Sequence, residues 1–398
     1  MRLLAKFGTL SACLVFALTG MLGAQSIQGL AGQQEKSTTD SKYHYSHIAV
    51  GGLTSCAMTE TDGLKCWGAN GRGQVGDGTG EDRYKPVDVI GLDKGVRSVT
   101  AGAGHTCVLM KSGNILCWGR GDYGELGAQW LGTASPGPVD DIGDKGLGLF
   151  VAAGSLHTCA IIRDAGVKCW GSNTFGELGI GNTDIAKSFK PVDVVGLKGE
   201  TVSLSLGHFY GCAINTKRRV QCWGMNLNGQ LGDGTTTDRY LPVDVPLGGV
   251  VAISAMNQTC ALTNVGDVYC WGYNHDGQVG DGTTTDRLLP VKVLSGAVSV
   301  STGEVSTCAL MKTGRMKCWG YNYNGELGNG TWRSSKRPVD VIGPAAVEVN
   351  SKDYHSCART TRGKIVCWGY GSNGALGIGT TFSNDRGSEN TPVQVKGF

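Results

Sequence analysis

The cysteines of this chain recur in pairs ten positions apart, and every second cysteine is followed by Trp-Gly. Two cysteines at a fixed spacing can form a disulfide bond or contribute to a metal site. Zinc sites favour ligands two to four positions apart with further cysteine or histidine partners, so the ten-residue spacing favours disulfide bonds. The predicted pairs are Cys56 with Cys66, Cys107 with Cys117, Cys159 with Cys169, Cys212 with Cys222, Cys260 with Cys270, Cys308 with Cys318, and Cys357 with Cys367.

The residues between the paired cysteines are typical of a β-hairpin. In CVLMKSGNILC, residues 107–117, two apolar runs flank Lys-Ser-Gly. If Cys107 faces Cys117, a three-residue loop remains, and Gly113 occupies the place where such loops favour a left-handed residue. Directly opposed residues of antiparallel strands lie within disulfide reach, so we predict that each pair joins the two strands of one hairpin.

Three histidines are candidates for metal binding because they stand at one repeated position, two residues before a cysteine. They are His105, His157 and His355, whereas other repeats have Thr54, Tyr210, Gln258 and Ser306 there. A metal site would need ligands in neighbouring repeats, and these substitutions interrupt any such ring. The pattern therefore favours buried, hydrogen-bonding histidines, and we predict no metal site.

The aspartates of the segment GDGTTTDR are candidates for calcium binding. The segment lacks alternating acidic positions, and Asn329 replaces Asp233 or Asp281 in the sixth copy. Turn formation is therefore favoured. No nucleophile elbow, zinc-protease motif or phosphate-binding loop is present, so we predict neither catalytic residues nor a cofactor. An enzyme whose scattered Ser, His and Asp meet on one face is the alternative.

A second signature follows each cysteine pair, as in WGYNYNGELG at 319–328. Its asparagine is replaced by Gly121 and Gly371 in two copies, which predicts a left-handed backbone at that position. A turn, a PV-containing segment and a V-x-x-V run come next, giving four short extended segments per repeat. Four strands in each of seven repeats predict an all-β, seven-bladed β-propeller.

The entry segment G-x-x-H-T-C-x-L, the core WGxNxxGQLG and the following PV strand resemble the repeats of the regulator of chromosome condensation family. The resemblance covers residues 46–398 and implies a seven-bladed propeller. Family members include an exchange factor for the small GTPase Ran and a secreted bacterial β-lactamase inhibitor, which share protein binding through faces and loops. Exchange activity does not transfer to this chain, because we expect export and find no insertion resembling the exchange wedge. The cysteine pairs are a departure from the intracellular members.

The N-terminus has the features of a secretory signal. A basic start precedes the apolar stretch LVFALTGMLGA, which is too short to span a bilayer. We predict a signal peptide over 1–24, a flexible leader over 25–43 and a single propeller over 44–398. Cleavage after Ala31 and a lipoprotein site at LSAC, residues 10–13, are alternatives. Signal removal eliminates Cys13 and leaves an even number of cysteines, as a disulfide set in an oxidising compartment requires.

Charge excludes some classes of partner. Loss of Arg2 and Lys6 lowers the formal net charge from +3 to +1, and no basic block stands out. A nucleic-acid binder needs a basic face, so we predict no nucleic-acid partner. We also predict no membrane span in the mature chain and a monomer.

Positions that differ between repeats are candidates for binding, because the repeated positions are explained by folding. Exposed aromatic side chains at loop tips commonly anchor protein interfaces. The candidates are Tyr123, Trp130, Phe175, Tyr323 and Trp332. The alternative is that these side chains cover the edges of blades.

The sequence thus predicts a secreted, periplasmic or cell-surface propeller without enzymatic activity, which binds a protein or other macromolecule through its loops and faces. A secreted enzyme inhibitor and an enzyme with a site on the axial face are the alternatives. We also expect the ring to be closed by residues 392–395 pairing with the N-terminal strand around 47–50, because an open edge exposes unpaired backbone groups.

Overall fold

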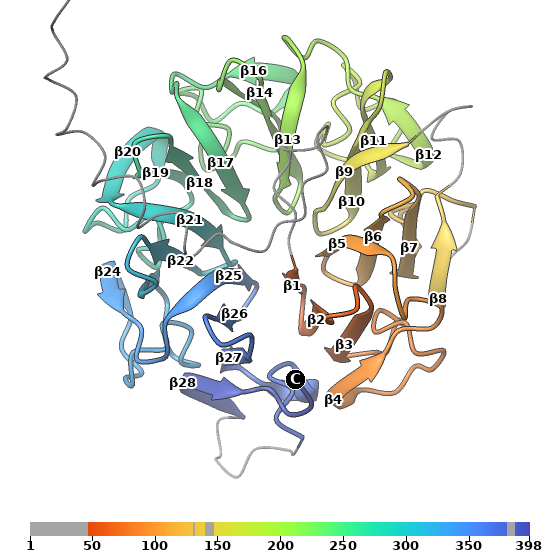
Figure 1. Cartoon of the computed structure of the whole chain (residues 1–398). Coiled ribbons are helices and arrows are strands. Elements are labelled where there is room, and N and C mark those ends of the chain that lie inside the picture. The colour runs from red at the N-terminus through yellow and green to blue at the C-terminus, as the bar shows by residue number, and fades with distance from the viewer. Residues whose placement is uncertain (1–46, 130–131, 140–146, 380–386) are drawn as a thin grey trace, which may run out of the picture. The chain divides into compact units, whose positions relative to one another are not determined.

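The architecture is a ring of seven β-sheet blades around a central channel (Figure 1). The computed structural model describes residues 47–129, 132–139, 147–379 and 387–398, which all lie within one compact unit, Tyr43–Phe398. Each blade is a four-stranded antiparallel sheet built from four consecutive strands. The predicted seven-bladed propeller is confirmed. The predicted signal peptide and the whole of the predicted leader lie outside the described residues.

Each blade has an inner, a second, a third and an outer strand, counted outward from the channel. The strands of each kind are named below in order from blade 1 to blade 7. The inner strands are β1 (Ile48–Val50), β5 (Val96–Ala101), β9 (Gly148–Ala153), β13 (Thr201–Leu206), β17 (Val250–Ala255), β21 (Ala297–Thr302) and β25 (Ala346–Lys352). The second strands are β2 (Thr54–Met58), β6 (His105–Met110), β10 (His157–Ile162), β14 (Tyr210–Asn215), β18 (Gln258–Thr263), β22 (Ser306–Met311) and β26 (His355–Thr360). The third strands are β3 (Leu64–Gly68), β7 (Ile115–Arg120), β11 (Gly166–Ser172), β15 (Val220–Gly224), β19 (Asp267–Gly272), β23 (Met316–Gly320) and β27 (Ile365–Tyr370). The outer strands are β4 (Arg83–Asp88), β8 (Gly132–Pro138), β12 (Lys187–Asp193), β16 (Arg239–Asp244), β20 (Arg287–Ser295), β24 (Ser335–Asp340) and β28 (Ser388–Gln394), and a 3₁₀ turn, η1 (Ser372–Gly374), precedes β28.

The core lies in the second and third strands, which are covered on both faces by neighbouring blades. Every residue of β10 is buried, whereas the outer strand β4 has no buried residue. Strands that are buried on both faces are nearly continuous in apolar and small residues rather than alternating. This explains why segments such as HTCAII carry so few charges.

A disulfide bond joins the second and third strands of every blade, with paired Cα atoms 4.0–4.1 Å apart. Cys107 directly opposes Cys117, and Gly113 closes this hairpin with a φ of +91°. In blade 4, where glycine is absent, Arg218 takes the left-handed place with a φ of +59°. The prediction of local staples is confirmed for all seven pairs: Cys56 with Cys66, Cys107 with Cys117, Cys159 with Cys169, Cys212 with Cys222, Cys260 with Cys270, Cys308 with Cys318, and Cys357 with Cys367.

The tryptophan that follows each second cysteine locks its blade to the preceding blade. Trp271 is fully buried, and its indole Nε1 donates to the backbone oxygen of Gln230, 2.9 Å away, in blade 4. An added Cβ at Gly232 would lie 2.5 Å from the same Nε1, so glycine is required for this close approach. Equivalent bonds join Trp67 to Ala375, Trp118 to Gln74, Trp170 to Glu125, Trp223 to Glu177, Trp319 to Gln278 and Trp368 to Glu326.

Two of the three repeated histidines form a second set of junction bonds. His105 Nε2 lies 2.9 Å from Thr158 Oγ1, and His355 Nε2 lies 2.8 Å from Ser55 Oγ in the next blade. His157 is also buried, and burial lowers the pKa of His157 and of His355 to about 3, so both are neutral. The hydrogen-bonding interpretation is confirmed for His105 and His355.

Ring closure differs from the sequence expectation. Residues 392–395 belong to β28 and its end, and β28 pairs with β27 of its own blade, not with β1. The V-x-x-V run forms the inner strand at the start of each blade, so the last PV strand is the outer strand of blade 7. Side chains make the closing junction instead: Glu348 Oε1 accepts from the backbone nitrogens of His47 and Ile48, at 3.0 and 3.2 Å. The C-terminal Phe398 packs against Trp67, with ring centroids 5.8 Å apart.

The two faces of the ring carry different connections. Because the strands alternate in direction, the loops between first and second strands and those between third and fourth strands lie on one face, which we call the loop face. The disulfide hairpins and the connections between blades lie on the other, the hairpin face. The longest within-blade connections, such as residues 273–286 between β19 and β20, are on the loop face.

Candidate functional site

The loops between the third and fourth strands are organised by the asparagine of the second signature. Asn226 is fully buried: its Oδ1 accepts from the backbone nitrogen of Leu231 at 3.0 Å, and its Nδ2 donates to backbone oxygens of Thr235 and Thr237. Neither the asparagines nor Gly121 and Gly371 have a positive φ, so the predicted left-handed backbone is wrong. The asparagine is needed for its side-chain amide, which forms hydrogen bonds with the backbone of its own loop.

The aspartates of GDGTTTDR complete the same loops. Asp233 Oδ1 accepts from the backbone nitrogen and hydroxyl of Thr235, at 2.9 and 2.7 Å, and its Oδ2 pairs with Arg239. Burial alone would raise the pKa of Asp233, but these bonds hold this pKa below its usual value. In blade 6, Asn329 makes the same threonine bonds. The turn interpretation is confirmed.

Four of the five predicted anchors are described, and all four lie in loops between third and fourth strands. Tyr123 is 42% exposed and Tyr323 is 61% exposed, whereas the framework tryptophans have no exposed surface. Phe175 and Trp332 are partly buried, and the Phe175 ring lies 5.2 Å from that of Phe209 in the next blade. Each is therefore more exposed than the framework tryptophans, although Phe175 also serves as packing between blades. Trp130 lies outside the described residues.

The anchors share the loop face but do not form one cluster. Tyr123 and Phe175 belong to the neighbouring blades 2 and 3, and Tyr323 and Trp332 belong to a single loop of blade 6. The two groups are separated by blades 4 and 5 on one side of the ring and blades 7 and 1 on the other. A partner that contacted both groups would have to cover the mouth of the channel.

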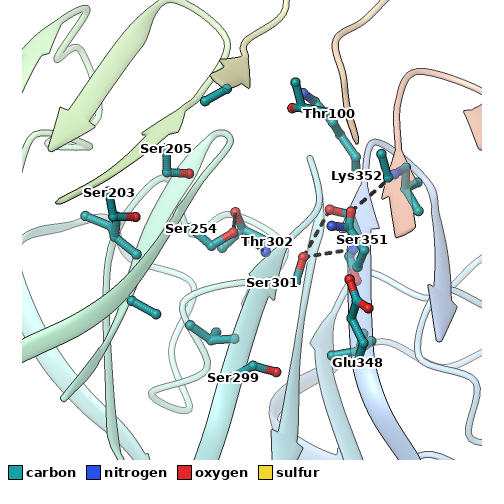
Figure 2. A pocket seen from close by; sticks show the side chains of 18 of the residues that line it. Thr100, Ser203, Ser205, Ser254, Ser299, Ser301, Thr302, Glu348, Ser351 and Lys352 are labelled. Carbon is teal, nitrogen blue, oxygen red and sulfur yellow. Dashed lines mark hydrogen bonds between the residues drawn. The ribbon is translucent and has the colours of Figure 1, made fainter. Parts of the chain in front are cut away.

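The central channel is a cavity of about 520 Å³ lined by the inner strands of all seven blades, with hydroxyl and charged side chains among aliphatic ones. Figure 2 shows several of the lining hydroxyl groups, among them those of Ser205, Ser254 and Ser301. The hydroxyl groups of the channel are used to join the blades. Ser205, Ser254 and Ser301 each accept, through Oγ, from a backbone nitrogen of the next inner strand, at 2.8–3.0 Å. Thr100 does the same at 3.1 Å. The polarity of the channel therefore has a structural explanation.

Lys352 lines the channel at the loop face and connects blade 7 to two other blades. It extends from blade 7 and donates from Nζ to the backbone oxygens of Ala101 and Ala153, at 2.7 and 2.9 Å, in blades 2 and 3. Burial lowers the pKa of its amine to about 8. Sequence reasoning missed this residue, although a signal exists: lysine stands here where the other repeats have Gly51, Gly102, Gly154, Gly207, Met256 and Gly303.

A Ser-His-Glu line lies beside Lys352. Ser155 Oγ is 2.8 Å from His208 Nδ1, and His208 Nε2 is 3.8 Å from Glu304 Oε1. Ser155 is only 4% exposed, which restricts the access that a nucleophile needs. Burial and then Lys352 lower the pKa of His208 to about 4, which makes it a weak base at neutral pH. The line has the composition of a hydrolase site but not its accessibility.

No group of His, Cys, Asp or Glu side chains with the geometry of a metal site occurs in the part of the chain that the structure describes. Likewise, none of the described residues forms a helix long and apolar enough to cross a bilayer.

These features define the chain as a disulfide-stapled seven-bladed β-propeller. The model of the RCC1-like domain matches residues 149–398, and models of the regulator of chromosome condensation repeat match residues 45–74, 96–125 and 66–109. The first match alone covers more than half of the chain, so the chain belongs to the regulator of chromosome condensation repeat family.

Known proteins agree with this assignment. The chain is 32% identical to the ultraviolet-B receptor UVR8 of Arabidopsis thaliana over 207 residues, 51% of this chain and 46% of UVR8. It is 33% identical to the E3 ubiquitin-protein ligase HERC2 of Homo sapiens over 195 residues, 48% of this chain and 4% of HERC2. It thus spans less than half the length of either relative.

Solved structures share the fold. Yeast RCC1 (Prp20), bound to Kap60, superposes with a TM-score of 0.74 at 22% identity, covering 92% of this chain and 90% of that one. Human WBSCR16 has a TM-score of 0.74 at 20% identity, covering 83% and 93%.

Proposed function

We propose that this chain is an exported, non-enzymatic propeller that binds a protein partner through its loop face. The observation that carries the proposal is that exposed aromatic side chains extend from loops whose backbones are hydrogen-bonded to buried side chains. The exposed ring of Tyr323 extends from a loop whose backbone is fixed by the buried Asn322 and by Asn329. The exposed ring of Tyr123 extends from a loop in which the buried Glu125 accepts from the backbone nitrogen of Tyr123 at 2.9 Å. Rigid presentation of aromatic anchors lowers the entropic cost of binding.

The disulfide set supports the extracellular part of the proposal. Seven disulfides in one chain are typical of an oxidising compartment such as the cell exterior or the periplasm. Among relatives, a solved complex of yeast RCC1 with Kap60 is an example of a propeller of this fold in contact with another protein.

The test is capture from the native secretome followed by titration of the captured protein. Residues 25–398 are immobilised, and the affinity of the captured protein is then measured for the parent, Tyr123→Ala, Tyr323→Ala and Val265→Ala. Val265 is the matched control, because it is 67% exposed but lies on the hairpin face. We expect at least one tyrosine substitution to weaken binding by ~1–3 kcal/mol and Val265→Ala to leave it unchanged. Equal losses for all three variants, or losses confined to Val265→Ala, would contradict the proposal.

The Ser-His-Glu line supports a rival function, hydrolysis by Ser155. A fluorophosphonate probe that labels active serines separates the two functions. We expect no labelling that depends on Ser155, because its side chain is buried and His208 is a weak base. Labelling that disappears in Ser155→Ala but persists in Ser203→Ala would establish the hydrolase instead.

A further inference from the structure

The loop face of blades 5–7 carries a surface of mixed aromatic and acidic character, which we call the acidic–tyrosine surface. Loops between third and fourth strands contribute part of it, and loops between first and second strands contribute the rest. Its residues are Tyr273, Asp276, Glu304, Tyr321, Asp353 and Tyr354. The exposed ring of Tyr323 lies beside it, 4.8 Å from the ring of Tyr321.

Contacts between blades hold this surface together. Tyr354 of blade 7 and Glu304 of blade 6 lie close enough for each to influence the pKa of the other. The backbone nitrogen of Glu304 donates to the backbone oxygen of Asp353 at 3.1 Å. Asn257 Nδ2 of blade 5 donates to the backbone oxygen of Glu304 at 3.2 Å. The backbone at Glu304 is therefore held from both neighbouring blades.

The negative charge of this surface is only partly matched. Asp353 Oδ1 is buried and has no hydrogen-bond partner among the described residues. The ammonium of Lys352, which lies next to it in sequence, is directed to the backbone oxygens of Ala101 and Ala153. Burial, and then the neighbouring Asp353, raises the pKa of Glu304. Burial and the carboxylates of Glu304 and Asp353 raise the pKa of Tyr354 to about 12. This field is local, because the whole chain has a formal net charge of +3.

Blade 2 shows how the same loop frame holds a cation. Arg120 occupies the position that Tyr321 has in blade 6 and Tyr273 in blade 5. Its Nε donates to Glu125 at 2.8 Å, and one terminal nitrogen donates to the backbone oxygen of Ser155 in the next blade at 3.0 Å. Its guanidinium carbon also lies 5.6 Å from the centre of the Tyr123 ring. A guanidinium in this frame thus meets a carboxylate, a loop carbonyl and an aromatic ring.

Blades 5 and 6 have tyrosine in place of this arginine and still carry carboxylates in their loops. Asp276 of blade 5 stands at the position of Tyr123. Glu326 of blade 6 stands at the position of Glu125, where blade 5 has Gln278. We propose that the acidic–tyrosine surface binds lysine or arginine side chains of a basic segment in the protein partner. Tyrosine faces attract cations, and carboxylates form charge-assisted hydrogen bonds with them. This inference rests on the proposed protein-binding function and adds the chemistry of the partner.

The experiment uses a peptide of Gly and Ser with three arginines, together with analogues in which citrulline or glutamate replaces arginine. Binding to residues 25–398 is measured by calorimetry at low and at physiological salt. We expect the arginine peptide to bind, the citrulline peptide to bind at least tenfold more weakly and the glutamate peptide not to bind. Affinity for the arginine peptide should also fall as salt is added, because exposed charges are screened. Equal binding of the arginine and citrulline peptides would overturn the inference.

Substitutions test whether the arginine peptide binds at the acidic–tyrosine surface. Asp276→Asn combined with Glu304→Gln should weaken binding of the arginine peptide about tenfold. Tyr323→Ala, which removes an exposed ring and leaves the fold intact, should weaken it several-fold. Asp122→Asn is the matched control, because it removes a half-exposed carboxylate from the same face in blade 2. An equal loss in Asp122→Asn would overturn the inference by showing attraction to the protein as a whole.

The two proposals fail in different ways. A captured partner that loses affinity in Tyr123→Ala but not in the Asp276→Asn, Glu304→Gln double variant would preserve protein binding and overturn the basic-segment inference. Specific binding of the arginine peptide with no protein partner in the secretome would sustain the cation site and contradict the proposed function.

Discussion

The junctions between blades and the loop face differ in how strictly their residues repeat: the junctions use the same contact in every blade, whereas the loop face varies. At every junction the same indole donates to the same backbone oxygen, and this includes the junction between blade 7 and blade 1. On the loop face, the residue after each Trp-Gly has five identities in the seven blades, with tyrosine in the last three. It is Ala69, Arg120, Ser172, Met225, Tyr273, Tyr321 and Tyr370 in turn. The repeated positions are committed to the framework, and the variable ones are available for recognition.

One position of the repeat contributes both to the junction between blades and to the loop. The Gln or Glu of G-[QE]-[LV]-G gives its backbone oxygen to the junction, and its side chain accepts from the backbone nitrogen two residues before it in the loop. Gln230 and Glu326 make this loop bond to Asn228 and Asn324 at 2.9 and 3.0 Å. A glutamine makes the bond without charge, whereas a buried glutamate needs compensation. Arg120 supplies it to Glu125, whereas the neutral amide of Asn324 faces Glu326.

The largest expected effect is the loss of a framework tryptophan. Trp271→Ala removes a fully buried indole and its bond to Gln230, and we expect it to lower the free energy of unfolding by about 3–5 kcal/mol. Denaturant titration with circular dichroism measures this. A change below about 1 kcal/mol would mean that the junctions do not carry the stability of the ring.

Removal of one disulfide should have the next largest effect. Replacing Cys107 and Cys117 together by alanine releases one hairpin, and loop entropy predicts a loss of roughly 2–3 kcal/mol, less if the hairpin persists in the unfolded chain. Denaturant titration of the double variant measures the loss. Peptide mapping without reduction should recover seven separate linked pairs in the parent, and bridges between different repeats would contradict the structure.

Substitution of Glu326 tests the shared position through pH. Burial raises the pKa of this carboxyl from 4.5 to about 7, and the folded protein therefore binds the proton more tightly than the unfolded chain. The stability of the parent should fall on this account as pH rises from 4.5 to 7. Glu326→Gln, which matches Gln230, should remove this dependence. The variant should be more stable than the parent by roughly 2 kcal/mol at about pH 8 and no more stable at about pH 4. Parallel pH profiles for the two proteins would contradict the assignment.

Local patterns predicted the blade well. The ten-residue spacing, with glycine or a tolerant residue in the turn, was sufficient for the seven disulfides, because each of them depends on one hairpin. The recurrence of Trp-Gly was sufficient for seven blades.

Contacts between distant segments could not be predicted in the same way. Lys352 binds oxygens that are 199 and 251 positions away in the sequence, so no local spacing reveals its partners. Ring closure was assigned to strand exchange because the sequence does not show which extended segment begins a blade. The interchange of Asn and Gly indicated a special backbone, but the chain uses the amide of Asn226 and its equivalents.

The smallest expected effect on stability is the loss of an exposed loop tyrosine. Tyr323 is 61% exposed, its loop is fixed by Asn322 and its ring contacts Tyr321, so Tyr323→Ala should change the free energy of unfolding by less than about 0.5 kcal/mol. Denaturant titration of this variant and of Trp271→Ala compares the free energy of unfolding that each region contributes. A loss above about 1 kcal/mol would assign Tyr323 to the framework, and its exposure would then serve packing at the blade edge. A small loss in stability together with a measurable loss in partner affinity is the outcome that separates a recognition residue from a structural one, because only the partner then registers the missing ring.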